Sequence, residues 1–325
     1  VAYTSDSTTL AVRDERKIVL LDAETHKPRG YPPVGLPGNT SEVAISPDGA
    51  MLVTATGIYA VLWNVSTGKR IGQPMKHDKA IKALAFSPDG KLLTTISKGG
   101  TVKLWDTYSQ KLLSTLRDES SELEDPNKPQ FHLLQVAFSP DGKLLALVYA
   151  NAVEFWDRTL QMPSRQAKIS GDEQDFPVSS AFSPDGGILA IAYGNGKVVL
   201  HDVATFAVVA TLKAGLVRSL AFSPSGKILA TGGADGPLKL WDMTTRRELL
   251  TLRGLSSTPY TGLIVFSPDG KRVASADSRR MRVWYAPTET KSAVETKPSA
   301  AANLWKSSSD PPSLIRAATE IRSRQ

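Results

Sequence analysis

The sequence predicts an all-β protein made of repeated four-stranded antiparallel sheets, and two observations carry this prediction. First, a turn of the form Ser-Pro-x-Gly occurs six times, at 46–49, 87–90, 139–142, 183–186, 223–226 and 267–270. Second, four short apolar runs fill most intervals of about 40 residues, which is too dense for helices. Each interval is therefore expected to form one small sheet.

A seventh, degraded copy of the unit opens the chain. The residues 1–7 align with 136–142, where the regular turn begins at Ser139. Counted from Thr4, successive turns are 42, 41, 52, 44, 40 and 44 residues apart. A repeat at this period indicates an array of similar units, which decides the fold class before any single element does.

Each unit has the same internal order. Proline presets the backbone at the second turn position, and glycine at the fourth accepts a left-handed conformation, so the first two runs are expected to form a hairpin. The third run ends in a two-residue signature. Its seven versions are Leu21-Asp22, Trp63-Asn64, Trp105-Asp106, Trp156-Asp157, His201-Asp202, Trp241-Asp242 and Trp284-Tyr285. A weaker fourth run follows most of them.

These turns and Trp-Asp endings resemble the WD-repeat family, over residues 1–285. The resemblance implies a seven-bladed β-propeller of four-stranded antiparallel blades, closed into a ring and used as a rigid platform for other proteins. It also implies a buried hydrogen-bonded network of His, Asp, Ser or Thr, and Trp in each blade. Here His77 fits the histidine position and Asp235 the aspartate position, with Glu15 as a stand-in, but no unit has the full set. We therefore expect the blades to depend on apolar packing and strand ladders.

The two ends of the chain raise the question of ring closure. In the family, a strand from before the first repeat usually pairs with the last blade. Because the chain begins at Val1, we expect either that the closing strand lies in a preceding part of a longer protein or that 290–296 supplies it from the C-terminal side. We favour the first, in which the chain is a fragment of a longer protein. Residues 286–325 are rich in Pro, Ser and Ala, which predicts an extension. Within this extension, 313–322 has the apolar spacing of a short helix.

Composition and motifs argue against an enzyme. The chain has no cysteine, which excludes disulfides and cysteine metal sites. None of the Gly-Lys pairs fits a phosphate-binding loop, and no hydrolase elbow or zinc-protease motif occurs. The four histidines, His26, His77, His132 and His201, fall in different units. We expect no cofactor, no metal and no catalysis; the alternative is a set of ligands gathered around a central channel.

Charged loops indicate where a partner would bind. The 52-residue spacing contains an acidic insert at 118–131, and the basic residues of units one and seven become neighbours when a ring closes. Loops before the first strand, and between the second and third strands, share one face of such a ring. The protein-binding candidates on or near it are Arg13, Arg16, Glu122, Glu124, Asp125, Tyr149, Asp172, Tyr193, Tyr260, Arg279 and Arg280. The alternative is that the charged loops are only solvated and the aromatic rings only pack against loops.

The leading hypothesis is a cytoplasmic protein-interaction scaffold or regulatory propeller of a larger signalling protein. Its partner would be another protein or another domain of the same chain, approached through complementary charge. The alternative is nucleic-acid binding through the basic sector, since the net charge is +7. The acidic insert opposes that alternative because it would repel a phosphate backbone. No segment has the roughly 20 apolar residues of a membrane span.

Overall fold

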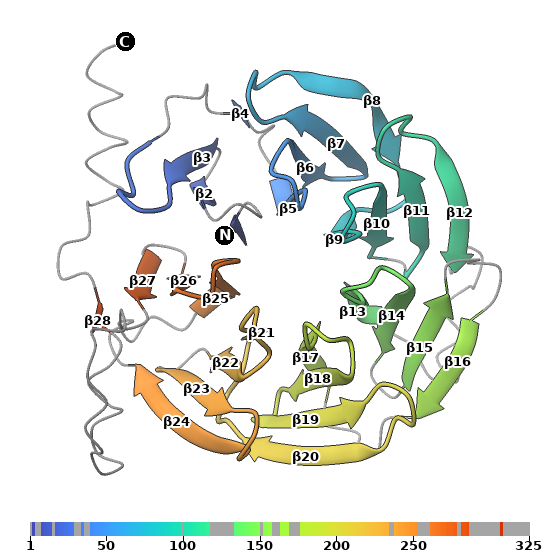
Figure 1. The fold of residues 1–325 in the computed structure, drawn as a ribbon. Coiled ribbons are helices and arrows are strands. Elements are labelled where there is room, and N and C mark those ends of the chain that lie inside the picture. The colour runs from blue at the N-terminus through green and yellow to red at the C-terminus, as the bar shows by residue number, and fades with distance from the viewer. Residues whose placement is uncertain are drawn as a thin grey trace.

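The computed structural model describes residues 2–3, 8–14, 17–28, 34–35, 40–98, 100–117, 133–149, 152–157, 163–168, 176–233, 237–252, 261–277, 281–285 and 306–307. Within these ranges the regular secondary structure consists of β-strands, which form seven four-stranded antiparallel sheets. The sheets stand around a central axis like the blades of a propeller (Figure 1). The all-β prediction and its four-stranded antiparallel sheets are confirmed.

We number the sheets 1 to 7 in chain order. Sheets 1 to 3 contain β1 Ala2–Tyr3, β2 Thr9–Asp14, β3 Lys17–Asp22, β4 Val34–Gly35, β5 Thr40–Ile45, β6 Met51–Thr56, β7 Tyr59–Asn64, β8 Arg70–Lys76, β9 Ile81–Phe86, β10 Leu92–Ser97, β11 Val102–Asp106 and β12 Leu112–Arg117. Sheets 4 and 5 contain β13 Leu133–Phe138, β14 Leu144–Tyr149, β15 Ala152–Asp157, β16 Pro163–Lys168, β17 Pro177–Phe182, β18 Ile188–Tyr193, β19 Lys197–Asp202 and β20 Val208–Lys213. Sheets 6 and 7 contain β21 Ser219–Phe222, β22 Ile228–Gly232, β23 Leu238–Asp242, β24 Arg247–Leu252, β25 Thr261–Phe266, β26 Arg272–Asp277, β27 Met281–Tyr285 and β28 Lys306–Ser307.

Every sheet is built from four consecutive strands of the chain. The first strand of each lies nearest the axis and the fourth on the outer rim (Figure 1). The first strand of sheet 1, β1, contacts the first strands of both sheet 2 and sheet 7, which closes the ring. Apolar side chains fill the spaces between neighbouring sheets, as where Phe155 of sheet 4 packs with Ile191 of sheet 5.

The last sheet is completed from the C-terminal side of the chain. Its fourth strand, β28, pairs with β27 through Trp284 with Ser307 and Tyr285 with Lys306. The fourth strand of the last sheet therefore comes from the C-terminal side of the chain. The expected segment 290–296 and the helix expected at 313–322 lie outside the described residues.

The Ser-Pro-x-Gly turns form as the sequence predicts, with side-chain bonds that fix them. In sheet 4, the Ser139 hydroxyl donates to Asp141 Oδ1 at 2.6 Å and accepts from the Leu144 amide at 2.9 Å. The Lys143 amide donates to the same carboxylate oxygen at 3.0 Å. Gly142 has a φ of 66°, in the left-handed region that glycine accepts without strain. The turn is thus specified entirely within six residues.

One expectation about the core needs correction. Blades were expected to lack the polar network of the family, but its Trp and Thr members are bonded in three sheets. The indole Nε1 groups donate to threonine Oγ1 on the adjacent strand at 2.8 to 2.9 Å, in the pairs Trp63–Thr54, Trp105–Thr95 and Trp241–Thr231. A leucine faces each tryptophan in the register, and the threonine lies two residues further along the same strand, as Thr95 does from Leu93. This diagonal bond does not need the missing aspartates.

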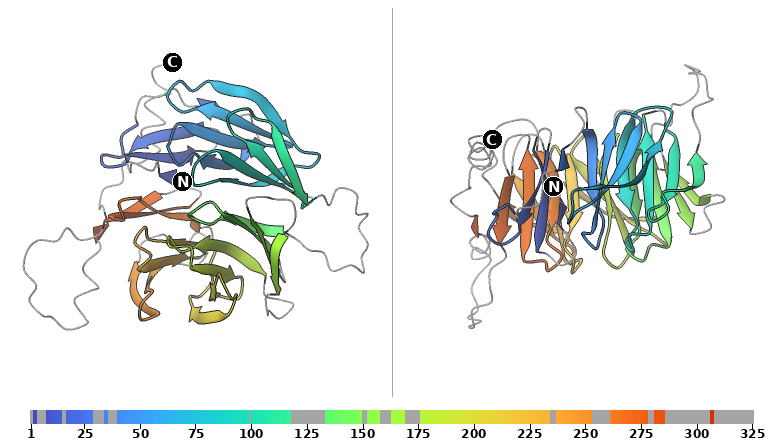
Figure 2. Two further views of the ribbon diagram at one scale, coloured as in Figure 1. Left: turned by 45° about the vertical axis from the view of Figure 1, so that its right-hand side comes forward. Right: turned by 90° about the horizontal axis from the view of Figure 1, so that it is seen from above.

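The ring has two distinct faces. Turns between the first and second strands, and between the third and fourth, lie on the side that faces the reader in Figure 1; we call this the turn face. The described links between second and third strands (57–58 and 194–196) and between successive sheets (77–80 and 214–218) lie on the other side, which we call the loop face. Figure 2 shows the ring from two further directions. The loop face is the one on which the sequence predicts partner binding.

Candidate protein-interaction surface

Most of the predicted binding residues lie outside the part of the chain that the structure describes. These are Arg16, Glu122, Glu124, Asp125, Asp172, Tyr260, Arg279 and Arg280. Arg13 belongs to strand β2, but its side chain is not described. The acidic and basic sectors therefore remain predictions.

Two predicted binding residues are inside the blades. Tyr149 is 0% exposed and donates its hydroxyl to Glu154 Oε2 at 3.0 Å, a carboxylate that also accepts from the Trp156 indole. Tyr193 is 3% exposed and packs in the apolar layer between sheets 4 and 5. A partner could not touch either ring in this structure. The packing alternative is the one the structure supports for both, because each ring, at the end of a second strand, packs against the preceding sheet.

Two large apolar side chains stand exposed on the loop face of sheets 5 and 6. Phe176 precedes β17 and is 53% exposed; Leu216 precedes β21 and is also 53% exposed. Between them lies the turn Gly194-Asn195-Gly196, which joins β18 to β19. We call Phe176, Leu216 and this turn the apolar step. Exposed apolar groups on neighbouring blades are typical of a contact surface.

Backbone hydrogen bonds connect the segments that make up the apolar step. The Gly194 amide donates to the Phe176 carbonyl at 3.1 Å, and the Ala214 amide donates to the Gly196 carbonyl at 2.9 Å. A Cβ added to Gly194 would lie 3.2 Å from Phe176 Cζ, and one added to Gly196 only 2.8 Å from the Gly215 carbonyl carbon. Glycine is required at 196 for this approach. The two apolar side chains are therefore carried on a fixed backbone, which lowers the entropy cost of docking.

Other exposed apolar side chains are scattered around the molecule. Tyr59 is 42% exposed at the loop-face end of β7, and Tyr108 is 94% exposed in the turn between β11 and β12. On the outer fourth strands, the exposed aliphatic side chains are Leu112, Leu113, Val208 and Leu249. Single exposed apolar residues are normal on protein surfaces and need no functional explanation.

The described histidines have structural surroundings. His77 lies in the link between β8 and β9 and is fully buried, with its Nε2 2.5 Å from Thr95 Oγ1 of sheet 3. Burial, and then the nearby Lys103, lower the pKa of His77 to about 4 against the opposing effect of Asp78. His201 stacks on Phe206 with ring centroids 4.3 Å apart, and burial lowers its pKa. These contacts support the structural position predicted for His77, and His201 has similar buried surroundings.

Nowhere in the described ranges do three or more His, Asp or Glu side chains gather in a way that could hold a metal ion. Within the same ranges, no helix is long and apolar enough to cross a membrane.

Comparison with known proteins identifies the repeats. The family described as "WD domain, G-beta repeat" matches residues 68–106 and 206–242. WD repeats generally mediate protein–protein contacts and generally serve as non-enzymatic scaffolds.

Three curated relatives show the same repeats. WD repeat and SOCS box-containing protein 1 of Xenopus tropicalis is 33% identical over 111 residues, which is 33% of this chain and 24% of the relative. An uncharacterized WD repeat-containing protein of Synechocystis is 30% identical over 32% of this chain and 27% of its own length. A periodic tryptophan protein 2 homolog of Schizosaccharomyces pombe is 26% identical over 35% of this chain and 13% of its own. The matched part thus spans about a quarter or less of these relatives. With its repeated turns, four-stranded sheets and two matched repeats, the chain is similar to the WD-repeat family.

Proposed function

We propose that this protein is an interaction platform that binds a protein partner on the loop face of sheets 5 and 6. The observation that carries the proposal is the apolar step, where Phe176 and Leu216 stand exposed on a backbone fixed by hydrogen bonds. A partner that buries both side chains would gain the apolar burial that drives most protein association. Preorganised apolar anchors of this kind usually supply most of the binding energy.

Sequence next to the apolar step suggests the character of the partner. Asp172, Glu173 and Asp175 directly precede Phe176 in the chain. A partner surface with an apolar centre and basic residues on the matching side would be steered toward this place, since charge sets approach and register more than affinity. In this proposal the propeller serves a larger, cytoplasmic signalling protein, and the partner is a separate protein or another domain of that protein.

The test compares matched surface variants of the full chain. Phe176→Ala combined with Leu216→Ala removes the apolar step, and Leu112→Ala combined with Leu113→Ala removes two exposed apolar side chains from the rim strand β12. Proteins captured from an extract of the source organism are quantified for both variants and the wild type. We expect the specific partner to fall at least tenfold with the step variant and to stay within twofold with the rim variant. An equal loss of captured partner with both variants, or no loss with either, would overturn the proposal.

Two further measurements complete the test. Thermal unfolding must show that the step variant remains folded, because half of each side chain packs on the protein. Retention on heparin at low salt, lost steeply as salt rises, would instead favour the nucleic-acid alternative. Charge reversal at Arg279 and Arg280 is expected to reduce heparin retention only in that case.

A further inference from the structure

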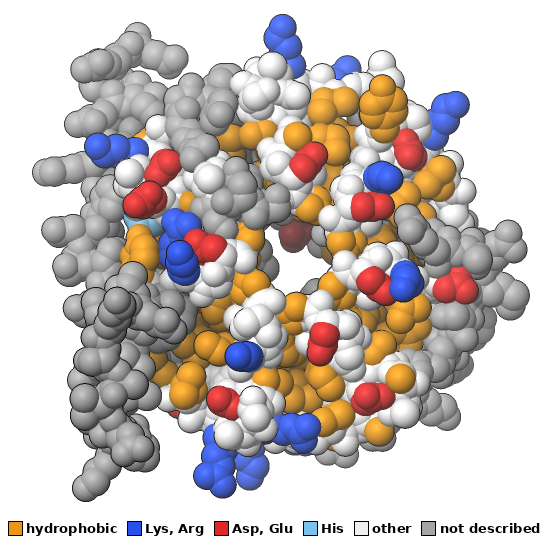
Figure 3. All heavy atoms as spheres, in the orientation of Figure 1, with side chains coloured by type: hydrophobic (Ala, Val, Ile, Leu, Met, Phe, Trp, Pro, Cys, Tyr) orange, Lys and Arg blue, Asp and Glu red, His pale blue; other side chains and the backbone are white. Residues whose placement is uncertain are grey.

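Exposed lysines gather on the loop face where sheet 2 meets sheet 3. Lys76 ends β8, Lys79 lies in the link 77–80 between the two sheets, and Lys98 follows the end of β10. All three residues are exposed. On the turn face, by contrast, Asp and Glu side chains stand around the central opening with Lys and Arg among them (Figure 3). We call these three lysines, together with the neighbouring Tyr59, the lysine cluster.

Backbone hydrogen bonds and strand pairing place the members of the lysine cluster side by side. The Lys98 amide donates to the Ala80 carbonyl at 2.7 Å, which joins sheet 3 to the link that carries Lys79. Tyr59 and Lys76 are partners in the register of β7 and β8. Residues paired in this way across an antiparallel ladder have neighbouring side chains. The cluster therefore forms one stretch of surface, although its residues come from both sheets and the link between them.

The three lysines have no counter-charge among the residues that the structure describes. Within those residues, none of their ammonium groups forms an ion pair or a hydrogen bond. The adjacent acid, Asp78, lies instead with its Oδ2 4.0 Å from Lys103 Nζ, a group that also donates to the Lys76 carbonyl at 3.2 Å. The other described acid at this end of the two sheets, Glu42, is on the inner strand β5. Positive charge therefore predominates on this part of the loop face.

Tyr59 adds an apolar surface beside these charges. It is 42% exposed and directly follows the two-residue turn that joins β6 to β7. Both carbonyls of that turn, Gly57 and Ile58, accept backbone amides at 2.8 Å, from Ile81 and His77 respectively. The turn is thus tied to the link and to sheet 3, so the ring is presented on a fixed backbone. A half-exposed aromatic ring of this kind can serve as an anchor for a partner.

We propose that the lysine cluster binds an acidic linear peptide of a partner protein, with its carboxylates beside the three lysines and an apolar side chain against Tyr59. Complementary charge steers and orients such a peptide, and the ring supplies the apolar contact. A nucleic acid fits less well, because a phosphate backbone running past the lysines would meet the Asp78 carboxylate, which is 72% exposed. The apolar step lies on other sheets and favours a basic partner, so the two proposals can fail separately.

The same two sheets supply a matched control for the test. The loop-face variant removes the three charges of the cluster through Lys76→Gln, Lys79→Gln and Lys98→Gln. The turn-face variant removes three exposed lysines from the opposite side of sheets 2 and 3, through Lys69→Gln, Lys91→Gln and Lys111→Gln. Both variants lose the same charge and keep most of the aliphatic stems, so a general effect of net charge would weaken binding equally in both. Tyr59→Ser removes the ring alone, and thermal unfolding shows whether each variant remains folded.

The experiment selects ligands without assuming their sequence. A phage-displayed library of random nine-residue peptides is enriched on the immobilised full chain, and the enriched peptides are synthesised and measured by fluorescence anisotropy. We expect several Asp or Glu residues with an aromatic or aliphatic residue among them. Affinity should fall at least tenfold with the loop-face variant and about fivefold with Tyr59→Ser. It should stay within twofold with the turn-face variant and with Phe176→Ala combined with Leu216→Ala.

Several results would overturn the proposal. These are no enrichment, enrichment of basic peptides, equal losses of affinity with the two lysine variants, and tighter binding of a single-stranded oligonucleotide than of any enriched peptide. Acids of this chain are the remaining competitor, since 118–131 includes Glu122, Glu124 and Asp125. Peptide binding that appears only after these three are changed to Gln, Gln and Asn would show that the chain's own acids, and not a partner, occupy the lysines.

Discussion

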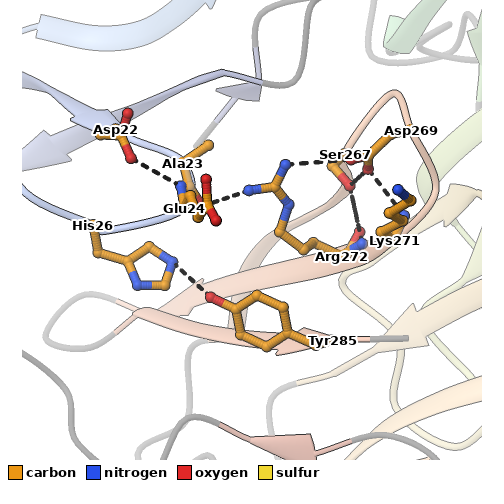
Figure 4. Close-up of polar contacts among 9 residues, drawn as sticks. All are labelled: Asp22, Ala23, Glu24, His26, Ser267, Asp269, Lys271, Arg272 and Tyr285. Atoms are coloured by element: carbon orange, nitrogen blue, oxygen red, sulfur yellow. Dashed lines mark hydrogen bonds and ion pairs between the residues drawn. The ribbon is translucent and has the colours of Figure 1, made fainter. Parts of the chain in front are cut away.

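Arg272 binds Ala23 across the place where the ring closes. The Nη1 of Arg272 donates to the Ala23 carbonyl oxygen at 2.7 Å, although 249 residues separate the two in the chain. The other guanidinium nitrogen, Nη2, lies 3.3 Å from Asp269 Oδ2 in the turn of sheet 7 (Figure 4). Beside them, Tyr285 of sheet 7 faces His26 of sheet 1, with ring centroids 6.5 Å apart. Because each sheet keeps its own four strands, side-chain contacts such as these join sheet 7 to sheet 1.

Replacing Arg272 is expected to weaken this junction. The side chain is only 12% exposed, and Arg272→Ala would leave the Ala23 carbonyl without its charged donor. A hydrogen bond to a charged group contributes about 1.5 to 3 kcal/mol, so we expect a loss of that order in the free energy of unfolding. Chemical denaturation measures it, and amide hydrogen exchange should quicken first in β2 and β26.

Arg246→Ala is the matched control for this prediction. Arg246 Nη1 donates to the Val209 carbonyl at 2.7 Å, also between two sheets, but far from the junction and at the exposed surface. We expect a smaller loss, about 1 kcal/mol or less, with no change in exchange at β2. A larger loss for Arg246→Ala than for Arg272→Ala would contradict a special role of the junction.

Two consecutive threonines of β10 should respond in opposite ways to the same substitution. Thr95 Oγ1 accepts from Trp105 Nε1 at 2.8 Å and lies 2.5 Å from His77 Nε2. Thr95→Val would leave both buried groups unsatisfied, at a cost of about 2 to 4 kcal/mol. Thr94 Oγ1 is buried with no hydrogen-bond partner in the described part of the chain, so Thr94→Val is expected to be neutral or stabilising. Equilibrium unfolding of the two variants decides, and similar losses would refute the prediction.

The protein should become less stable as the pH falls, because His77 has a lowered pKa in the folded state. Burial and Lys103 lower its pKa to about 4 in the folded protein, against an ordinary value near 6.5 when unfolded. Between those values the unfolded chain binds a proton that the folded protein does not, so the free energy of unfolding decreases as pH falls from 6.5 toward 4. This group alone accounts for about 2 kcal/mol of that decrease. In His77→Gln the slope over this pH range should be shallower; an unchanged slope would rule out His77 as the cause.

The turn of sheet 6 offers a stabilising change. Five regular turns carry aspartate in the third position, whereas sheet 6 has Ser225, whose hydroxyl lies a longer 3.1 Å from Ser223 and 3.4 Å from the Lys227 amide. Ser225→Asp would restore a charged acceptor for both donors, with an expected gain of about 0.5 to 1 kcal/mol. Asp141→Ser in sheet 4 is the reverse change and should cost a similar amount. Thermal unfolding measures the stability of both variants. A lower stability of Ser225→Asp than of the wild type would contradict the stabilising role of aspartate in this turn.

The repeat unit was predictable because its information is local. The bonds among Ser139, Asp141 and Leu144 lie within six residues, so a single turn specifies its own hairpin wherever it recurs. The threonine–tryptophan bonds were missed, although their signal is present: Thr95 and Trp105 stand ten residues apart, as do Thr231 and Trp241. The bond between threonine and tryptophan forms without the aspartate, so the aspartate position does not indicate whether it forms.

The candidate sites were less predictable, for a reason that differs from one residue to the next. Phe176 and Leu216 are 40 residues apart, and only the packing of sheet 5 against sheet 6 brings them to either side of a glycine turn. The sequence alone does not distinguish Tyr149 and Tyr193 from aromatic residues on the surface, yet the neighbouring sheet covers them. Exposure depends on what another repeat places alongside, and a pattern within one repeat does not contain that information.

The sequence by itself determined the all-β class, the four-stranded unit and the position of every regular turn, since hairpins are specified by residues in direct succession. Tertiary structure decided the rest. It supplied β28 for the last sheet, joined Arg272 to Ala23, buried two tyrosines and brought Lys98 beside the link that carries Lys79. Each of these depends on contacts between sheets, and such contacts form only when the ring has brought distant parts of the chain together.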